Sequence, residues 1–399
     1  MSLNETPSGE RVHIGFFGRG NAGKSSLVNA VTRQELSVVS DTLGTTTDAV
    51  SKAMELLPMG PVVIIDTPGF DDEGSLGQLR VKKTRQVLAK TDIAVLVADI
   101  GAGLGVCELE LIDIFKEQKT PFLIAWNKAD LLEEDAIRPA VDGCEQMYVS
   151  ALAKTNIEEL KEKIASMTVS SQTAPPIVGD LVKPMAKVVL VIPIDESAPK
   201  GRLILPQQQV IRELLEAGAV SICVRETELA GLLNDMMPQK PDLVITDSQA
   251  FKRVAADVPK DVLLTSFSIL MARHKGFLEE AVQGCRMIDK LKENDKVLIA
   301  EGCTHHRQCN DIGSVKIPRW LREHVGAQLM IETCSGRDFP DDLSQYALVI
   351  HCGGCMLNER EVLSRMERAK RQGVPFTNYG TAIAYMNGIL ERSIEVIYG

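Results

Sequence analysis

Soft metal ligands gather in two short segments of the sequence. The first segment is Cys303-Thr304-His305, and the second is His351-Cys352-Gly353-Gly354-Cys355. Three thiolates with one or two imidazoles can hold zinc or an iron–sulfur cluster, and the spacing alone does not choose between them. A scattered cysteine is more often simply buried, because free cysteine is among the most buried residue types. Two tight clusters of such side chains favour a metal site over ordinary core packing.

A second set of residues fits phosphate binding. The apolar run Val12–Phe17 leads into Gly18-Arg19-Gly20-Asn21-Ala22-Gly23-Lys24-Ser25 and then into a helical pattern, which is the phosphate-loop motif in its expected context. The glycines let backbone N–H groups turn toward a phosphate, and the helix start adds favourable potential. We expect Lys24 to reach the β- and γ-phosphates and Ser25 to hold Mg²⁺. The residues expected to contact the nucleotide here are Gly18, Asn21, Ala22, Gly23, Lys24, Ser25 and Ser26.

Two further segments suit the γ-phosphate and its metal ion. The polar loop Asp41–Asp48 offers Thr46 as a second protein ligand of Mg²⁺. The apolar run Pro61–Ile65 delivers Asp66-Thr67-Pro68-Gly69, where Asp66 can hold Mg²⁺ through water and the Gly69 N–H can contact the γ-phosphate. We therefore expect Lys24, Thr46, Asp66 and Gly69 to carry the hydrolysis of the nucleotide.

Two segments downstream fit a guanine base. Asn127-Lys128-Ala129-Asp130 follows the apolar run Phe122–Trp126. The Asp130 carboxylate can accept hydrogen bonds from both guanine N–H donors, while Asn127 and Lys128 frame the base. Ser150-Ala151 follows another strand pattern, and the Ala151 N–H can donate to the guanine oxygen. Five elements in this order predict a GTPase that binds GTP and Mg²⁺.

This set resembles the Era/TrmE-like branch of GTPases. Phe70 follows Gly69 at the position where Ras-like proteins carry the glutamine that positions the attacking water, so another group must place that water. The neighbouring acidic residues 71–73 can place water, or they form only a solvated turn. Asn21 matches the asparagine that helps hold K⁺ in potassium-activated members of this branch. The resemblance therefore implies K⁺-stimulated hydrolysis.

The elements around the cysteines explain how their two segments can meet. Lys296–Ala300 and Tyr346–Ile350 are short apolar runs that each end at a cysteine segment, and such runs are typical of buried parallel strands. In a parallel sheet the carboxyl ends of the strands lie on one edge, where ligands normally bind. The two cysteine segments are therefore expected to converge at that edge. Helical patterns at 277–291, 318–325 and 359–372 complete an α/β layer.

The pattern as a whole predicts an α/β chain of three domains, a P-loop GTPase followed by two smaller parallel-sheet domains. We expect a GTPase domain over 1–172, a dimerisation domain over 173–265 and a cluster-binding domain over 266–399. The polar, proline-ended stretch Val169–Pro176 separates the first two. The middle domain shows no catalytic set, so subunit contact is its default role. Cys223 alternates with apolar neighbours in one of its strands, so we expect it in the core.

Composition limits the classes of protein to consider. A chain of 399 residues exceeds what one core normally spans, so two or three domains are expected. No apolar run is long enough for a spanning helix, and the start lacks the features of a signal peptide, so we expect a cytoplasmic protein without membrane contact. Nine cysteines there are thiols or metal ligands rather than disulfides. The net charge of −10 argues against nucleic-acid binding.

A GTPase followed by Cys-x-His and then His-Cys-x-x-Cys resembles the HydF family of FeFe-hydrogenase maturation GTPases over the whole chain. The resemblance implies a 4Fe-4S cluster held by Cys303, Cys352 and Cys355. It implies a fourth iron site that is open, exchangeable or loosely held by a histidine, and both His305 and His351 match the family pattern, with His306 a less favoured candidate. The other cysteines fall outside the pattern.

The same resemblance implies a role as scaffold or carrier. A homodimer would receive the transient diiron precursor of the hydrogenase active site from radical-SAM hydrogenase maturases and would deliver it to the apo FeFe-hydrogenase. GTP hydrolysis would act on conformation or partner exchange rather than on the cluster chemistry.

Two other functions share parts of this pattern. A ribosome- or RNA-associated GTPase with a structural zinc site would have the same nucleotide motifs, but the acidic charge and the lack of a second Cys-x-x-Cys argue against it. A redox enzyme in the carboxyl-terminal half would need a flavin or dinucleotide fingerprint, and we find none.

Overall fold

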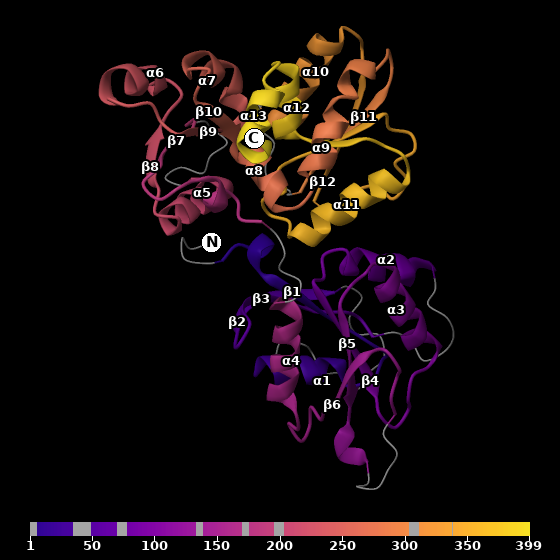
Figure 1. Ribbon diagram of the computed structural model, residues 1–399. Helices are drawn as coiled ribbons and strands as arrows, with labels where there is room; N and C mark the ends of the chain where they lie inside the picture. The colour runs from indigo at the N-terminus through magenta and orange to yellow at the C-terminus, as the bar shows by residue number, and fades with distance from the viewer. Residues whose placement is uncertain are drawn as a thin grey trace. The chain divides into compact units, whose positions relative to one another are not determined.

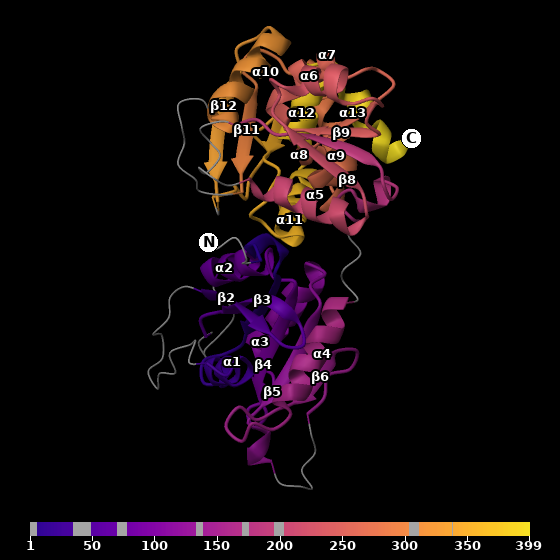
Figure 2. The same cartoon turned by 90° about the vertical axis from the view of Figure 1, so that its left-hand side faces the viewer.

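The computed structural model describes residues 6–34, 49–69, 78–132, 139–169, 175–194, 203–302, 311–336 and 338–399. The chain forms two compact units, Met1–Thr173 and Ala174–Gly399 (Figures 1 and 2). The first unit has one sheet and the second has two, and each unit has its own hydrophobic cores.

The first unit is built on a six-stranded sheet in the order β2-β3-β1-β4-β5-β6. Strand β2 runs antiparallel to β3, and every other pair of neighbours is parallel. The bounds are β1 Val12–Phe17, β2 Val50–Leu56, β3 Gly60–Asp66, β4 Ile93–Asp99, β5 Phe122–Asn127 and β6 Glu145–Tyr148.

Helices cover both faces of this sheet. Because successive strand residues point to opposite faces, Phe16 of β1 packs in one core with Leu27 and Leu160. Its neighbour Phe17 packs in the other core, where its ring lies 5.2 Å from that of Phe115. Helices α1 and α4 therefore lie on one face, and α2 and α3 on the other. The bounds are α1 Lys24–Thr32, α2 Gln78–Leu88, α3 Val106–Glu117 and α4 Ile157–Val169.

The second unit holds two four-stranded sheets, and all of their strands pair in parallel. Their orders are β10-β9-β7-β8 and β12-β11-β13-β14. The first sheet has β7 Lys187–Val191, β8 Val220–Val224, β9 Leu243–Thr246 and β10 Leu263–Ser266. The second has β11 Lys296–Glu301, β12 Met330–Ser335, β13 Leu348–His351 and β14 Phe376–Asn378.

The helices of the second unit follow the expected alternation with strands. Their bounds are α5 Leu205–Glu216, α6 Leu229–Gly231, α7 Phe251–Asp257, α8 Phe267–His274, α9 Leu278–Cys285, α10 Ile317–Val325, α11 Glu359–Arg371, α12 Tyr379–Met386 and α13 Leu390–Tyr398. The helix predicted at 277–291 is wrong in its extent. Helix α9 ends at Cys285, and a 3₁₀ turn at Ile288–Lys290 follows it, because the Met287 N–H donates to Gly284 O and tightens the chain.

One hydrophobic core joins the two sheets of the second unit. Val244 of β9 and Ile299 of β11 belong to the same buried cluster. Helix α8 contributes Ile269 to that cluster, whereas its Leu270 packs in the separate core on the other face of the first sheet. The predicted α/β chain with a GTPase-type sheet and two smaller parallel sheets is confirmed, and the two smaller sheets are fused into one unit.

The prediction that Cys223 lies in the core is wrong. Strand β8 is the edge strand of its sheet, and Cys223 is exposed there. Alternation with apolar neighbours identified the strand, but an edge strand does not bury its residues as a central strand does. In the part of the chain that the structure describes, no helix has the length and apolar character needed to cross a membrane.

Candidate functional site

The phosphate loop is shaped by close backbone contacts. A side chain at Gly18 would lie 2.3 Å from the carbonyl oxygen of Val97 on β4, so only glycine fits. Gly23 has a φ of 80°, and a Cβ there would lie 2.3 Å from Asn127 Nδ2. These contacts position the loop at the carboxyl edge of the sheet, directly before α1. Asn21, the residue expected to hold K⁺, is exposed and has a φ of 62°.

Lys24, Ser25 and Asp66 meet at this edge. The Lys24 Nζ lies 3.3 Å from Asp66 Oδ1, and the Ser25 hydroxyl donates to Asp66 Oδ2 at 3.2 Å. The Oδ1 atom is buried and makes no hydrogen bond within the described ranges. A buried carboxylate oxygen beside a serine hydroxyl is the kind of oxygen ligand set that Mg²⁺ prefers, so these residues fit that ion. A Cβ at Gly69 would lie 3.0 Å from the Gly20 nitrogen, which places Gly69 against the phosphate loop.

The residues predicted to bind the base also come together. Asn127 Nδ2 donates to Ala22 O at 3.0 Å, and Asn127 Oδ1 accepts from the Ala151 N–H at 3.1 Å, so Asn127 connects the phosphate loop to the base loop. Ser150 Oγ donates to Asp130 Oδ1 at 2.5 Å. These contacts bring Ala151 next to Asn127 and Asp130 next to Ser150.

Lys128 is fixed by a partner outside the motifs. Its Nζ lies 2.6 Å from Asp99 Oδ2 at the end of β4. Partial burial acts to raise the pKa of Asp99, but hydrogen bonds from Lys128 and from the Gly101 N–H outweigh it and hold the pKa below its usual value. The carboxylate therefore stays ionised and keeps the lysine in position.

Arg19 was missed by the motif analysis, although it lies inside the phosphate loop. Its Nε donates to Glu108 Oε1 at 2.5 Å, and its Nη2 donates to Gly103 O at 2.9 Å. Glu108 is fully buried and also accepts the Gly105 N–H at the start of α3. The phosphate loop is thus tied to α3 by an ion pair. Thr46 and Phe70 lie outside the described residues, so their predicted roles stay predictions.

The strands that precede the two cysteine segments, β11 and β13, end at the same edge of their sheet. Strands β11 and β13 are parallel, with Ala300 paired to His351. The Gly302 N–H donates to Cys352 Sγ at 3.0 Å, and the Gly354 N–H lies 3.4 Å from the same sulfur. Cys303, the next residue after Gly302, lies outside the described residues together with His305 and His306. Gly302, which contacts Cys352, is therefore one residue before Cys303 in the sequence.

Glycines let this loop pack tightly. A Cβ at Gly302 would lie 2.8 Å from Leu357 Cγ. Gly354 has a φ of 63°, and a Cβ there would lie 2.9 Å from Val362 Cγ2. A substitution at Gly354 would be both strained and crowded.

Both described thiols lie in surroundings that disfavour a free thiolate. Burial raises the pKa of Cys352, and hydrogen bonds from Gly302 and Gly354 oppose that effect. Burial also raises the pKa of Cys355, and the Lys275 charge opposes it. N–H donors aimed at sulfur are typical of iron–sulfur sites, where they stabilise charge on the cluster. The two thiols and the position of Gly302 therefore fit a cluster completed by Cys303.

His351 has both ring nitrogens engaged. Its Nδ1 lies 2.7 Å from Cys352 O, and its Nε2 lies 3.2 Å from Arg365 Nη1. Because arginine only donates, Nε2 must accept and Nδ1 must carry the proton. Burial, together with the Arg365 charge, lowers the pKa of His351 to about 3, so the ring is neutral. The ring packs near Phe376, with centroids 5.7 Å apart, and acts here as a hydrogen-bonded core residue.

Two basic residues beside the cysteine loop were also missed by the sequence analysis. Arg365 is buried on α11 and donates to Gly336 O at 2.6 Å in addition to its contact with His351. Lys275, directly after α8, donates to Leu357 O at 2.7 Å. No periodic pattern distinguishes a single buried lysine or arginine from an exposed one. Within the described ranges no three His, Cys, Asp or Glu residues converge as a metal site, and Cys303 lies outside those ranges.

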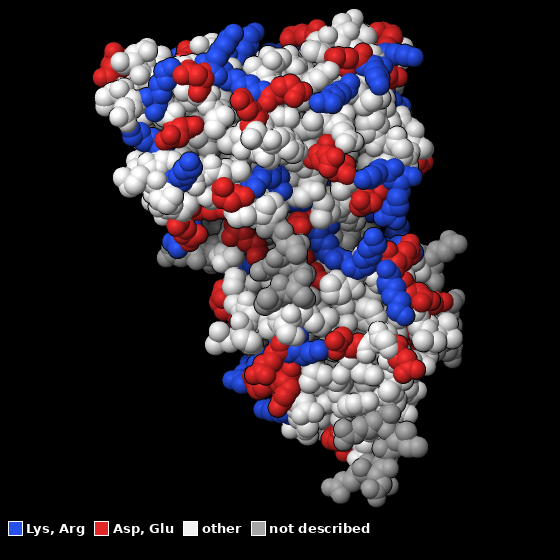
Figure 3. All heavy atoms as spheres, in the orientation of Figure 1, with Lys and Arg blue, Asp and Glu red and all other residues white. Residues whose placement is uncertain are grey.

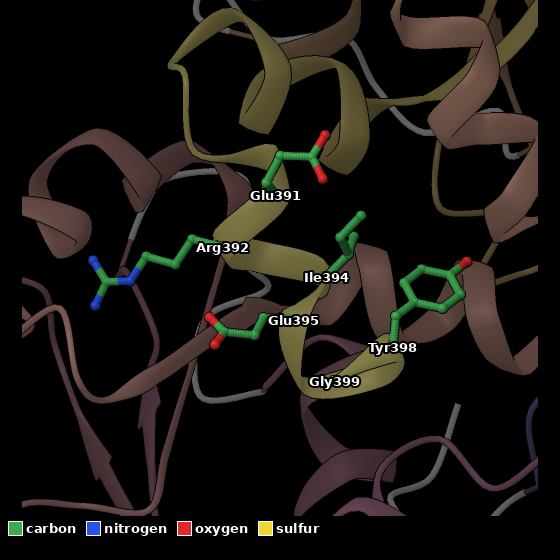
Figure 4. Close-up of a pocket in the computed structure, with 6 residues that line it drawn as sticks. All are labelled: Glu391, Arg392, Ile394, Glu395, Tyr398 and Gly399. Carbon is green, nitrogen blue, oxygen red and sulfur yellow. The ribbon is translucent and has the colours of Figure 1, made fainter.

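A surface hollow of about 520 Å³ lies on α13 and belongs to neither site (Figure 4). In this view the Arg392 side chain points away from the Tyr398 ring. The guanidinium donates instead to backbone carbonyls near α7 and β10, including Pro259 O at 2.6 Å. The hollow carries no set of side chains suited to a nucleotide or a metal. Its lining residues are Glu391, Arg392, Ile394, Glu395, Tyr398 and Gly399.

Three protein-family models match the chain in separate ranges. Residues 13–128 match the family described as 50S ribosome-binding GTPase. Residues 177–276 match the hydrogen maturase F dimerization domain, and residues 279–396 match the hydrogen maturase F tetramerization domain. The names of these last two domains support self-association of the chain.

Curated relatives match the GTPase part alone. The tRNA modification GTPase MnmE of Clostridioides difficile is 32% identical over 156 residues, which is 38% of this chain and 33% of that protein. MnmE of Enterococcus faecalis is 32% identical over 168 residues, which is 41% of this chain and 36% of that protein. The chain thus spans about a third of the length of these relatives.

Among solved structures, the G domain of the Thermotoga maritima FeoB iron transporter is 26% identical, with a TM-score of 0.31, over 40% of this chain and 99% of that one. The family assignment rests on the three domain matches taken together. With an Era/TrmE-type GTPase domain followed by both hydrogen maturase F domains, the chain belongs to the HydF family of hydrogenase maturation GTPases.

Proposed function

We propose that this protein hydrolyses GTP to GDP and phosphate while it serves as a scaffold in the maturation of an FeFe-hydrogenase. The nucleotide half of the proposal is supported by the meeting of Lys24, Ser25 and Asp66. It is also supported by the contact of Asn127 with both the phosphate loop and Ala151. Both contacts support a single site for the phosphates and the base.

Each of the predicted site residues would have a separate role in GTP hydrolysis. Lys24 would leave Asp66 and contact the β- and γ-phosphates, and the Gly69 N–H would contact the γ-phosphate from the other side. Ser25 and Thr46 would hold Mg²⁺, with Asp66 reaching it through water, and Mg²⁺ would neutralise charge that develops on the phosphates. Asn21 would hold K⁺, so we expect K⁺ to stimulate the reaction.

A 4Fe-4S cluster held by Cys303, Cys352 and Cys355 is the second half of the proposal. The single observation that supports it best is the hydrogen bond from the Gly302 N–H to Cys352 Sγ, because Gly302 directly precedes Cys303 in the sequence. His351 has both ring nitrogens occupied, so His305 is the better candidate for a fourth ligand. A fourth iron site that is open or weakly held would let the cluster bridge to an incoming diiron unit.

The proposed partners follow from that role. A self-associated, cytoplasmic form of this protein would take the diiron precursor from radical-SAM hydrogenase maturases and pass it to the apo FeFe-hydrogenase. We propose no nucleic-acid partner. Lys and Arg are interspersed with Asp and Glu on the face of the second unit seen in Figure 3. Such a mixed face does not provide the clustered positive charge that nucleic-acid binding needs.

The experiment that tests the cluster is iron and sulfide analysis with EPR. Protein reconstituted without oxygen and then reduced should contain about four iron and four sulfide per chain and give a reduced-cluster signal. Cys303→Ala, Cys352→Ala and Cys355→Ala should each lose most of the iron and the signal. Cys223→Ala is the matched control, because Cys223 is exposed on β8 and should leave the iron content unchanged.

The same preparations distinguish the alternative function. One tightly bound zinc per chain, without a stable cluster, would identify a GTPase with a structural zinc site and would refute the scaffold proposal. Each cysteine variant should keep its GTP hydrolysis, since the nucleotide residues lie in a separate unit.

A further inference from the structure

We propose that Lys275 is a positioning residue of the cysteine loop, which anchors the loop from α8 and places a positive charge beside the cluster. This inference rests on the proposed cluster site. It assigns a role to a residue in the range of the dimerization-domain match, 177–276, rather than in the range that contains the cysteines.

The contacts of Lys275 bracket Cys355. Its ammonium donates to the carbonyl oxygen of Gly354 and, at 2.7 Å, to that of Leu357. Gly354 O also accepts the Leu357 N–H at 3.0 Å, so one carbonyl closes the turn around Cys355 and is held by the lysine. Lys275 is only 4% exposed. A buried ammonium with fixed carbonyl partners holds those carbonyls in place, because moving them would leave buried groups unsatisfied.

Residues at both ends of helix α8 contact the loop. Near the start of α8, Ser268 Oγ lies 3.7 Å from the position of a Cβ on Gly353. After its end, Lys275 Nζ lies 3.9 Å from the corresponding position on Gly354. The helix is itself held between two hydrophobic cores, by Ile269 on one side and Leu270 on the other. The loop is therefore contacted by a helix that is buried on both sides.

The positive charge of Lys275 lies close to Cys355, one of the proposed cluster ligands. The Lys275 ammonium is buried and donates to the carbonyl oxygens of Gly354 and Leu357, on either side of Cys355. The same charge would favour any species with more negative charge at the loop, and a reduced cluster is more negative than an oxidised one. Lys275 should therefore raise the reduction potential of the cluster as well as hold the loop.

Three variants separate charge from packing. Lys275→Gln and Lys275→Met remove the charge, whereas Lys275→Arg keeps it. In a potentiometric EPR titration of the reconstituted protein, the midpoint potential should become more negative in the Gln and Met variants and stay near that of the parent in the Arg variant. Iron loss to a chelator should be about tenfold faster in Lys275→Met, as is typical when a residue that supports metal ligands is removed. Lys370→Met is the control, because Lys370 forms an ion pair with Glu280 at the surface of α11.

A potential in Lys275→Gln equal to that of the parent would overturn the proposal. If Lys275→Met fails to fold, the comparison of the Gln and Arg variants decides the same point. Amide exchange in metal-free protein tests the anchoring without any cluster: the Leu357 N–H should exchange about tenfold faster in Lys275→Gln. Unchanged exchange would refute the anchoring. If the parent takes up no cluster at all, the proposed function fails, and the exchange experiment still decides whether Lys275 holds the loop.

Discussion

Asp130 is predicted to recognise the guanine base, and its carboxylate accepts a hydrogen bond from the Ser150 hydroxyl. A carboxylate can accept two hydrogen bonds from guanine, whereas an amide would bring its own N–H₂ against one guanine donor. We predict that Asp130→Asn weakens GTP binding by roughly ten- to a hundredfold, since hydrogen bonds to a charged group contribute about 1.5–3 kcal/mol. Competition binding with GTP and XTP would measure the change.

The control for this change is Asp113→Asn, because Asp113 is exposed on α3. It removes the same charge and should leave the preference for GTP over XTP intact. If Asp130→Asn kept that preference, Asp130 would not be the residue that recognises guanine.

Residues whose chemistry is set by a motif could be predicted from the sequence. Lys24, Ser25 and Asp66 meet as expected, because their spacing follows from a strand, a loop and a helix start. Arg19 and Lys275 could not be predicted. Their partners are single carboxylates or carbonyls distant in the sequence, and burial of one charged side chain leaves no periodic pattern.

At the scale of elements, the Arg19–Glu108 ion pair connects the phosphate loop to α3. Glu108 is fully buried, and the Arg19 side chain is 19% exposed. Removal of one partner would leave the other charge buried without its main compensation. We therefore predict that Arg19→Met lowers the free energy of unfolding of the first unit by roughly 3 kcal/mol. Urea unfolding followed by the fluorescence of Trp126, which is buried in this unit, would measure the loss.

A double variant tests whether the ion pair itself causes that loss. Glu108→Gln keeps an oxygen acceptor for the Gly105 N–H and removes the buried charge. Added to Arg19→Met, it should restore about 1–2 kcal/mol, because the uncompensated charge is gone. A double variant as unstable as the sum of the two single variants would show that the two side chains act independently.

Strands could be predicted from the sequence where they are central in a sheet, because such strands are apolar runs. Strands β1, β5 and β11 lie as expected, since each is buried on both faces. Strand β12 was not predicted, because it is an edge strand whose sequence Met330–Ser335 mixes apolar and polar residues. Helix α8 was not predicted either. Both of its sides are buried, so it lacks the one-sided apolar stripe of a surface helix.

At the scale of the whole molecule, the sequence predicted three domains, and the structure has two compact units. The polar stretch before residue 176 marked the first boundary because linkers have a distinct composition. Whether the two smaller sheets share one core depends on which of their residues face each other. Amino-acid composition does not indicate which residues these are. Arg392 of α13 is part of that relation, since it donates to Val258 O, Pro259 O and Val262 O in the segment before β10.

This organisation predicts two separate unfolding transitions. The chain has two tryptophans, Trp126 in the first unit and Trp320 in the second, so single-tryptophan variants report on each unit. GTP with Mg²⁺ at about a hundred times its dissociation constant should stabilise the Trp126 transition by about 2.7 kcal/mol and leave the Trp320 transition in place. Arg392→Met should do the reverse, lowering the stability of the second unit by about 2–3 kcal/mol because partly buried carbonyls lose a charged donor.

The control for Arg392→Met is Arg371→Met, which removes the same charge from an exposed position on α11. Both smaller sheets share one core, so the Trp320 transition should remain a single step in every variant. A split of that transition in Arg392→Met would mean that the two sheets fold as separate domains joined mainly by this arginine. If the Trp126 and Trp320 transitions coincided and both responded to GTP and to Arg392→Met, the whole chain would unfold as one cooperative body. In that case GTP binding would raise the free energy of unfolding of the cysteine loop together with that of the rest of the chain.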